Sequence, residues 1–217
     1  MAHSFIRRSR GRFSCRLEPE ECSVISQVAR EVSELIRADL GLDEPRGSAA
    51  LRVWDRESDD PLARLQAEAA QDGAARIPHD PATQRLFPAA SDDEGTAQEF
   101  RRLCQRSLAD SHLGALSVMR AGLDARGQFD DNADSTLILD HAEALEWLKG
   151  LNILRLVLGD RLGLSSDGDF EALQLLCHND LEEAPDEDSE VAGVSYVASV
   201  YEFLSWLQQS LVYQMSR

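Results

Sequence analysis

The sequence predicts an all-α, or mainly α, protein: a single-domain bundle of five to six helices with at most a small two-stranded sheet. Five segments repeat their apolar residues with a period near 3.6, which is typical of helices that bury one face. Only two short stretches have the apolar pattern of strands. Of the 217 residues, 43% are hydrophobic, which is enough for most of the chain to fold around a core.

The N-terminal part is predicted to form a strand and then a long helix. Apolar and polar residues alternate from Phe13 to Leu17, as in a half-buried strand. Pro19 suits the first position of a helix, and the acids beside it suit the positive end of the helix dipole. Apolar residues then recur every three or four positions up to Leu40, and Gly41 is expected to end this helix.

Two helices and a single helical turn between them are predicted in the middle of the chain, because each begins at an acid or an Asp-Pro pair. They cover residues 60–70, a single turn that begins at residue 80, and residues 94–123. Leu86 and Phe87 are expected to anchor the single turn to the core. The long helix is expected to turn one apolar stripe inward, made of Phe100, Leu103, Cys104, Leu108, Leu116 and Met119.

The C-terminal part is predicted to hold a second strand and three helices. The strand, Thr136–Leu139, could pair with the first one. Asp140 and Glu143 have the spacing of a capping box, which indicates a helix start. A shorter helix is expected over residues 169–180. The last helix, from about Val191 to Met215, is apolar almost all round, so we expect it in the centre of the bundle or in a homodimer interface.

Charge is distributed unevenly along the chain. There are 39 acids against 22 lysines and arginines, so the net charge is −17. Residues 1–16 carry five arginines and no acid, whereas residues 162–217 carry eleven acids and one base. A surface this negative repels phosphate, which argues against a general nucleic-acid-binding protein. Residues 1–12 are predicted to be a basic, flexible arm, and residues 13–217 a single helical domain.

The two charged segments are candidates for binding. The arginines of the arm could contact phosphates of DNA, although no helix-turn-helix with a basic recognition helix is recognisable. These candidates are Arg7, Arg8, Arg10 and Arg12. The acidic run is either a solvated loop or a docking surface for a basic partner. Its candidates are Glu182, Glu183, Asp186, Glu187 and Asp188.

Four cysteines are spread widely, without the CxxC or histidine spacing of zinc sites. Their simplest interpretation is as small buried hydrophobic residues. The alternative is a reversible pair between Cys15 and Cys22, since both are expected to face the same interior across a strand-to-helix turn. We expect neither a metal site nor a cofactor.

Several functional signals are missing from the sequence. It contains no phosphate-binding loop, dinucleotide fingerprint, hydrolase elbow or HExxH motif, and its histidines do not converge, so we expect no enzyme. The first residues lack the apolar run of a signal peptide. The polar residues of the last helix disfavour a membrane span. We therefore expect a cytoplasmic protein without a membrane partner.

Three stretches resemble the actinobacterial domain-of-unknown-function family 2017. They are RLFPAASDDEGTAQEFRRL (residues 85–103), LILDHAEALEWLKGLNILRLVLGDRLG (137–163) and YEFLSWLQQSLV (201–212). The resemblance implies a cytoplasmic protein from a family partly described as oxidative-stress transcriptional regulators. Such regulators work with a sigma factor and sense redox state through an intramolecular disulfide. Members also tend to be encoded beside an adaptor of the Clp protease.

Three functions follow as hypotheses from these observations. The first is a non-enzymatic, redox-linked transcriptional regulator that acts by binding a protein, expected to be a sigma factor. The alternative is an adaptor or scaffold for Clp-type regulated proteolysis, without catalysis. A weaker third is DNA binding, either directly through the arginine arm or indirectly through the partner. A homodimer is compatible with each of them.

Overall fold

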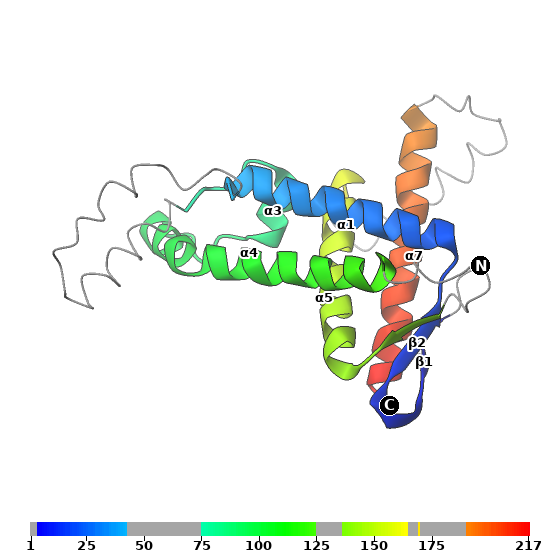
Figure 1. The fold of residues 1–217 in the computed structure, drawn as a ribbon. Coiled ribbons are helices and arrows are strands. Elements are labelled where there is room, and N and C mark those ends of the chain that lie inside the picture. Colours follow the sequence, from blue (N-terminus) through cyan, green and yellow to red (C-terminus); the bar gives the residue numbers. More distant parts are fainter. Residues whose placement is uncertain (1–3, 43–74, 125–135, 165–168, 170–189) are drawn as a thin grey trace, which may run out of the picture. The chain divides into compact units, whose positions relative to one another are not determined.

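The computed structural model describes residues 4–42, 75–124, 136–164, 169 and 190–217. These residues form five α-helices and one three-stranded antiparallel sheet, so the mainly α class is confirmed (Figure 1). The helices are α1 (Pro19–Leu40), α3 (Pro81–Leu86), α4 (Glu94–Asp124), α5 (His141–Arg161) and α7 (Glu190–Met215). The strands are β1 (Ile6–Arg7), β2 (Phe13–Arg16) and β3 (Thr136–Leu139).

The chain divides by its internal contacts into two compact units. Residues 1–33 and 111–217 form the first unit, and residues 34–110 form the second. The helices α1 and α4 each run through both units, so the single domain over residues 13–217 stays a prediction. The helix predicted over residues 60–70 lies outside the described residues, as does nearly all of the one over 169–180.

Both ends of α1 follow the predicted chemistry. At its start, the Glu21 carboxylate accepts a hydrogen bond from the Glu18 backbone N–H at 2.8 Å. At its end, Gly41 has a φ of +64°, in the left-handed region that glycine adopts without strain. The Leu42 N–H then turns back to the Arg37 carbonyl at 2.8 Å, which closes the helix with a Schellman motif.

The helix α5 is capped at both ends. Asp140 accepts from the Glu143 N–H at 2.9 Å, and the Glu143 carboxylate accepts from the Asp140 N–H at 2.8 Å. This reciprocal pair is the predicted capping box. Gly163, with φ +70°, ends the helix, and the Leu164 N–H donates to the Gly159 carbonyl at 2.8 Å.

The sheet has the strand order β1-β2-β3, with both pairs antiparallel. The pairing of β2 with β3 confirms the two predicted strands, with Cys15 opposite Leu137 and Ser14 opposite Ile138. The limit of two strands was wrong, because Ile6–Arg7 adds a third. A strand of two residues among arginines has no alternating pattern, so the sequence offered no signal for it.

The first described residues are part of this core. Phe5 is fully buried, and its ring meets the Trp147 ring edge-on at 6.4 Å between centroids. Its backbone N–H donates to the Ser210 hydroxyl of α7 at 3.3 Å. Residues 4–12 therefore have a defined place in the fold, in contrast to the flexible arm expected from the sequence.

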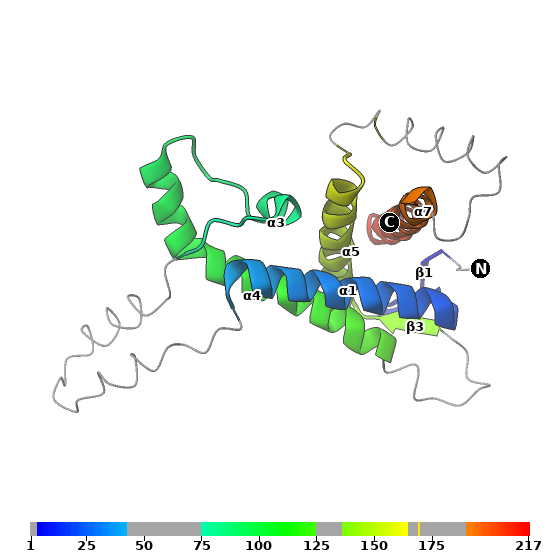
Figure 2. The ribbon, with the colours of Figure 1, turned by 90° about the horizontal axis from the view of Figure 1, so that it is seen from above.

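The core of the first unit is centred on α5, which contacts α7 and β3, while α7 also contacts β1 (Figures 1 and 2). Trp147 is fully buried in this region. Gly150 allows a close approach, because a Cβ there would lie 2.6 Å from the Met119 Cε atom. The largest fully buried side chains of this unit are Phe5, Leu17, Ile25, Leu116, Met119, Trp147, Leu151, Leu154, Leu204, Leu207 and Leu211.

In the second unit, a carboxylate holds the segment that leads into α3. The two Asp39 oxygens accept from the N–H groups of His79 and Asp80, at 3.0 and 3.1 Å. Asp80 caps α3 in turn, as its Asp-Pro pair predicts. Leu86 and Phe87 are buried, which confirms the expected anchor.

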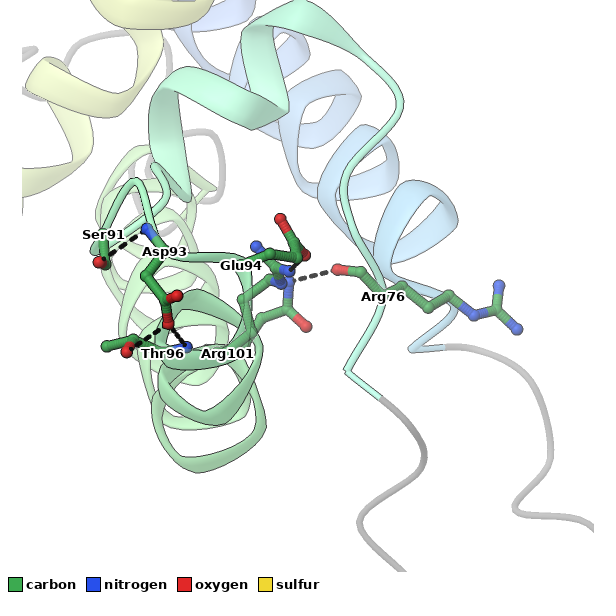
Figure 3. A network of polar contacts seen from close by, with 7 residues as sticks. Arg76, Ser91, Asp93, Glu94, Thr96 and Arg101 are labelled. Atoms are coloured by element: carbon green, nitrogen blue, oxygen red, sulfur yellow. Dashed lines mark hydrogen bonds and ion pairs between the residues drawn. The ribbon is translucent and has the colours of Figure 1, made fainter.

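The start of α4, also in the second unit, is stabilised by side chains (Figure 3). The Asp93 carboxylate accepts from both the N–H and the hydroxyl of Thr96 at 2.8 Å, and these bonds lower the Asp93 pKa below its ordinary value. Glu94 and Arg101, two turns apart on α4, form an ion pair at 2.7 Å.

The predicted single stripe of α4 is only partly correct. Leu116 and Met119 are buried in the first unit, but Phe100 and Leu103 are exposed. In the half of α4 that belongs to the second unit, the buried positions are held by the small residues Ala97 and Ala109. Alanine is compatible with either face of a helix, so the pattern of larger residues was misleading there.

Candidate functional site: the arginine hairpin

The strands β1 and β2 form a hairpin, here called the arginine hairpin (residues 6–16). Its turn is a 3-10 segment, Ser9–Gly11, closed by a hydrogen bond from the Arg8 N–H to the Arg12 carbonyl at 2.7 Å. Arg10 has a φ of +62°, a left-handed conformation that costs a non-glycine residue about 1–2 kcal/mol. The pairing of β1 with β2 holds the arginine there.

All five arginines of the hairpin are exposed. Arg8 donates from Nε to the Ser14 hydroxyl at 2.8 Å, which fixes its side chain against the sheet. Within the described residues, none of the five forms an ion pair with an acid. In a chain with a net charge of −17, the hairpin is therefore a concentrated group of positive charges that no acid of the described residues pairs with. The five residues are Arg7, Arg8, Arg10, Arg12 and Arg16.

The positive surface has an apolar centre. Ile6, Ser14 and Ile138 lie side by side in register across the three strands, so their side chains share one face of the sheet. Ile6 is 44% exposed and Ile138 is 54% exposed, while Ser14 between them is covered. The isoleucine side chain has no donor or charge that could bind a phosphate, whereas it is well suited to burial under a protein partner.

The two cysteines of the predicted pair lie at the base of the hairpin and just after it. Cys15 of β2 is buried, and its Sγ lies 3.8 Å from the Arg16 carbonyl oxygen. Cys22 lies in the first turn of α1 and is partly exposed, with its N–H bonded to the Glu18 carbonyl at 3.0 Å. The structure holds both as thiols, and their oxidation to a disulfide stays a prediction.

The acidic candidates cannot be placed. Glu182, Glu183, Asp186, Glu187 and Asp188 lie outside the described residues, so their docking role also stays a prediction. Across the ranges that the structure does describe, no three side chains of the metal-ligand type come together. In the same ranges, no helix has both the length and the apolar character needed to cross a membrane.

A polar cluster between α5 and α7 was not foreseen from the sequence. Arg155 donates from Nε to the Ser205 hydroxyl at 2.8 Å, and from its two terminal nitrogens to the Gln208 side-chain carbonyl and the Tyr201 hydroxyl. Its guanidinium also lies 5.4 Å from the centre of the Tyr201 ring. The partners are about fifty positions apart in sequence, and an arginine within the apolar stretch Leu151–Leu158 was the only signal for them. The cluster fixes the rotation of α7 against α5.

A second polar group joins α4 to α5 in the same unit. Lys149, the only lysine of the chain, lies 3.0 Å from both Glu146 carboxylate oxygens and 3.3 Å from the Ser111 hydroxyl. Burial, and secondarily the Lys149 cation, lower the pKa of His112 below its ordinary value. His112 is therefore neutral at physiological pH.

By its architecture, this is a mainly α protein with a small antiparallel sheet and a basic hairpin. The chain matches the family described as Domain of unknown function (DUF2017) over residues 2–215, so it belongs to that family. This confirms the family resemblance of the three quoted stretches. Comparisons with curated proteins and with solved structures find no match.

Proposed function

We propose that this protein is a non-enzymatic, redox-linked regulator of transcription in the oxidative-stress response. It acts in the cytoplasm by binding a protein of the sigma-factor type. The observation that carries the proposal is the arginine hairpin, which presents exposed arginines in the same small sheet as the exposed Ile6 and Ile138 and whose base contains the buried thiol of Cys15.

The composition of the hairpin favours a protein partner over DNA. Phosphates are bound by cations and by other hydrogen-bond donors, whereas this surface also presents two isoleucines that have no such group. Arginine rims around apolar centres are typical of protein interfaces. The partner surface that fits the hairpin is acidic with an apolar centre.

The redox link is proposed to run through Cys15 and Cys22. Peroxide would oxidise the two thiols to one disulfide and would itself be reduced to two molecules of water. The partly exposed Cys22 is the thiol that an oxidant reaches first, and Cys15 then resolves the sulfenic acid. A disulfide requires the two Cα atoms to lie within about 7 Å, so it would constrain the turn between β2 and α1 that begins at Arg16.

Affinity capture from the native host tests the partner. The bait variants are the wild type, Arg10→Glu/Arg12→Glu in the hairpin, and Arg102→Glu/Arg106→Glu on α4 as a control with the same change in charge. We expect the wild type and the control to recover a sigma factor, and the hairpin variant to recover at least tenfold less of it. Equal recovery by all three baits would contradict a role of the hairpin in binding the partner. Recovery of Clp components instead would support the adaptor alternative.

Mass spectrometry after mild peroxide treatment tests the redox link. We expect a Cys15–Cys22 disulfide in the wild type, and sigma-factor binding that no longer responds to peroxide in Cys22→Ser. If both thiols stay reduced while binding still responds to the oxidant, this pair is not the sensor. Cys104→Ser, which removes a partly exposed thiol of α4, is the matched control.

A further inference from the structure

The direction of the backbone groups in the sheet follows from one hydrogen bond of the arginine hairpin. The Arg8 N–H donates to the Arg12 carbonyl, and these two residues continue the register of the Ile6–Ser14 pair. In an antiparallel ladder, pairs that exchange hydrogen bonds alternate with pairs that do not. Ile6 and Ser14 are therefore a bonded pair, and the N–H and C=O of Ser14 point toward β1.

The strand β3 consequently has an open edge at Ile138. The residues on either side of Ser14 direct their backbone groups toward β3, where they meet Leu137 and Leu139. Ile138 lies between these two leucines, so its N–H and C=O point away from the sheet. Within the described residues, neither group has a hydrogen-bond partner. Edge groups of this kind are a template for pairing with another strand.

The opposite edge of the sheet is covered by α7. By the same alternation, the residue before Ile6 directs its backbone groups outward from β1. This residue is Phe5, and its N–H donates to the Ser210 hydroxyl of α7, which lies along β1 (Figure 1). The bond agrees with the deduced directions, because an inward N–H could not reach a helix outside the sheet. Among the described residues, β3 is thus the edge that stays open.

The side chains beside this edge indicate what kind of strand fits it. Ile138 is 54% exposed on the outer face of the sheet. Arg12 and Arg16 lie two residues before and after Ser14 in extended backbone, so on that face they flank the Ser14–Ile138 pair diagonally. Both arginines are exposed. A strand added to β3 would therefore meet an apolar side chain with a cation on either side of it.

From these observations we propose that an extended acidic segment of the partner protein binds by adding a strand to the open edge of β3. The inference rests on the proposed protein partner and names the part of it that is recognised. The segment bonds its backbone to the N–H and C=O of Ile138 and places an apolar residue opposite this side chain. Acids two positions to either side of the apolar residue pair with Arg12 and Arg16.

Distance and charge both fit this arrangement. The added strand lies two strand spacings, about 9.6 Å, from β2, which the long side chains of arginine and glutamate bridge together. A second copy of the chain fits the edge less well. Pairing β3 with β3 would bring the arginines of two hairpins into one sheet, where like charges repel.

A proline at position 138 tests the edge in the affinity capture described above. Ile138→Pro removes the outward N–H but no bond of the ladder, and proline occurs on edge strands where its nitrogen faces away from the ladder. Ile138→Val keeps the N–H and an apolar side chain, so it is the matched control. We expect the proline bait to recover at least tenfold less sigma factor than the valine bait. Circular dichroism checks that both variants fold, and if the proline variant does not, the peptide comparison below decides.

A synthetic peptide, Thr-Glu-Thr-Val-Thr-Glu-Thr, tests the same edge on the purified full chain by nuclear magnetic resonance. We expect the Ile138 amide signal to shift as the peptide is added. Methylation of the valine nitrogen, which blocks its bond to the Ile138 carbonyl, should raise the dissociation constant at least tenfold. Arg12→Glu/Arg16→Glu in the protein should do the same, whereas Arg102→Glu/Arg106→Glu on α4 should leave it unchanged.

Four outcomes would overturn the edge pairing. They are a peptide that does not bind, equal binding of the methylated peptide, equal recovery of sigma factor by the Ile138→Pro bait, and a dimer of the purified chain that Ile138→Pro dissociates. The last would assign the edge to a second copy. Equal recovery leaves the sigma-factor proposal in place, whereas peptide binding at Ile138 without any sigma factor in the capture would refute the partner and support the edge.

Discussion

The helices α5 and α7 belong to the same unit, but they bury their side chains in different ways. α5 carries six charged residues of Asp, Glu, Lys and Arg type, whereas α7 carries two. Even so, α5 has neighbours on two sides, in α7 and β3, and its Trp147 is fully buried. α7 buries a row of leucines and leaves Trp206 and Tyr213 at the surface.

The comparison shows that apolar content alone does not make a helix central. α5 is central because small residues let its neighbours approach: Gly150 lies against Met119, and Gly159 lies against Tyr201. Its charges sit where they find partners, such as Glu146 beside Lys149. α7 has more apolar residues than its buried face holds, and Trp206, Val212 and Tyr213 remain exposed.

The largest expected effect comes from the two tryptophans of these helices. Trp147→Ala should lower the free energy of unfolding by about 3–5 kcal/mol, because it leaves a cavity under Phe5. Trp206→Ala should cost less than about 1 kcal/mol, since its side chain already meets solvent. Urea denaturation measures both losses. Equal losses of unfolding free energy in the two variants would contradict the conclusion that Trp147 of α5 is central and Trp206 of α7 is peripheral.

Within α7, a charge should separate the buried face from the exposed one. Leu204 is fully buried, so Leu204→Asp should lower the unfolding free energy by about 3 kcal/mol or more. Val212→Asp, at an exposed position of the same helix, should change it by less than about 0.5 kcal/mol. Thermal melting followed by circular dichroism distinguishes the two. An unchanged melting temperature for Leu204→Asp would mean that α7 does not hold the core.

The cap of α5 gives a smaller effect. Asp140→Ala removes the acceptor for the Glu143 N–H and should cost about 1 kcal/mol in chemical denaturation. Asp140→Asn keeps an acceptor oxygen at the same place and should recover most of that loss. If the two variants were equally destabilised, the capping box would not be what anchors the start of α5.

Gly122 of α4 and Gly150 of α5 should respond differently to replacement by alanine. A Cβ at Gly122 would lie 3.6 Å from both the Leu137 Cδ1 and the Trp147 Nε1 atoms, which is ordinary contact. Gly122→Ala should therefore stabilise the fold by about 0.5–1 kcal/mol through helix propensity. Gly150→Ala should lose that gain, because its Cβ would displace the buried Met119 side chain. Stabilisation by both, in the same urea titration, would show that α5 packs less closely than described.

The smallest expected effect is a pH dependence that comes from His112, next to α5. Its pKa is lowered in the folded protein, so the unfolded chain binds the additional proton first as the pH falls. The stability contributed by neutral His112 is complete above about pH 6.5 and is lost as the pH falls toward the lowered value. His112→Gln should flatten the stability profile between pH 7.5 and 5.5. If the unfolding free energy of the variant depends on pH as steeply as that of the wild type, groups other than His112 cause the dependence.

Local signals predicted much of the fold. Gly41 and the Asp140–Glu143 pair mark helix ends because their chemistry acts within a few residues. The pairing of β2 with β3 was also predicted, since each strand has its own apolar pattern. β1 and the exposure of Phe100 and Leu103 were not, because they depend on neighbours distant in sequence. For the site, the sequence indicated the arginines but could not show that a hairpin holds them in one sheet with two exposed isoleucines.

The bond between Phe5 and Ser210 has a consequence for the order in which the chain can fold. It joins positions 205 residues apart, and β2 finds β3 only after about 120 intervening residues. During synthesis the N-terminal segment must therefore wait, with Phe5 uncovered, until nearly the whole chain has been translated. Contacts between residues this distant in sequence slow folding and prolong the lifetime of aggregation-prone intermediates. A circular permutant that links residue 217 to residue 4 would make this contact local, and it should refold faster than the natural chain.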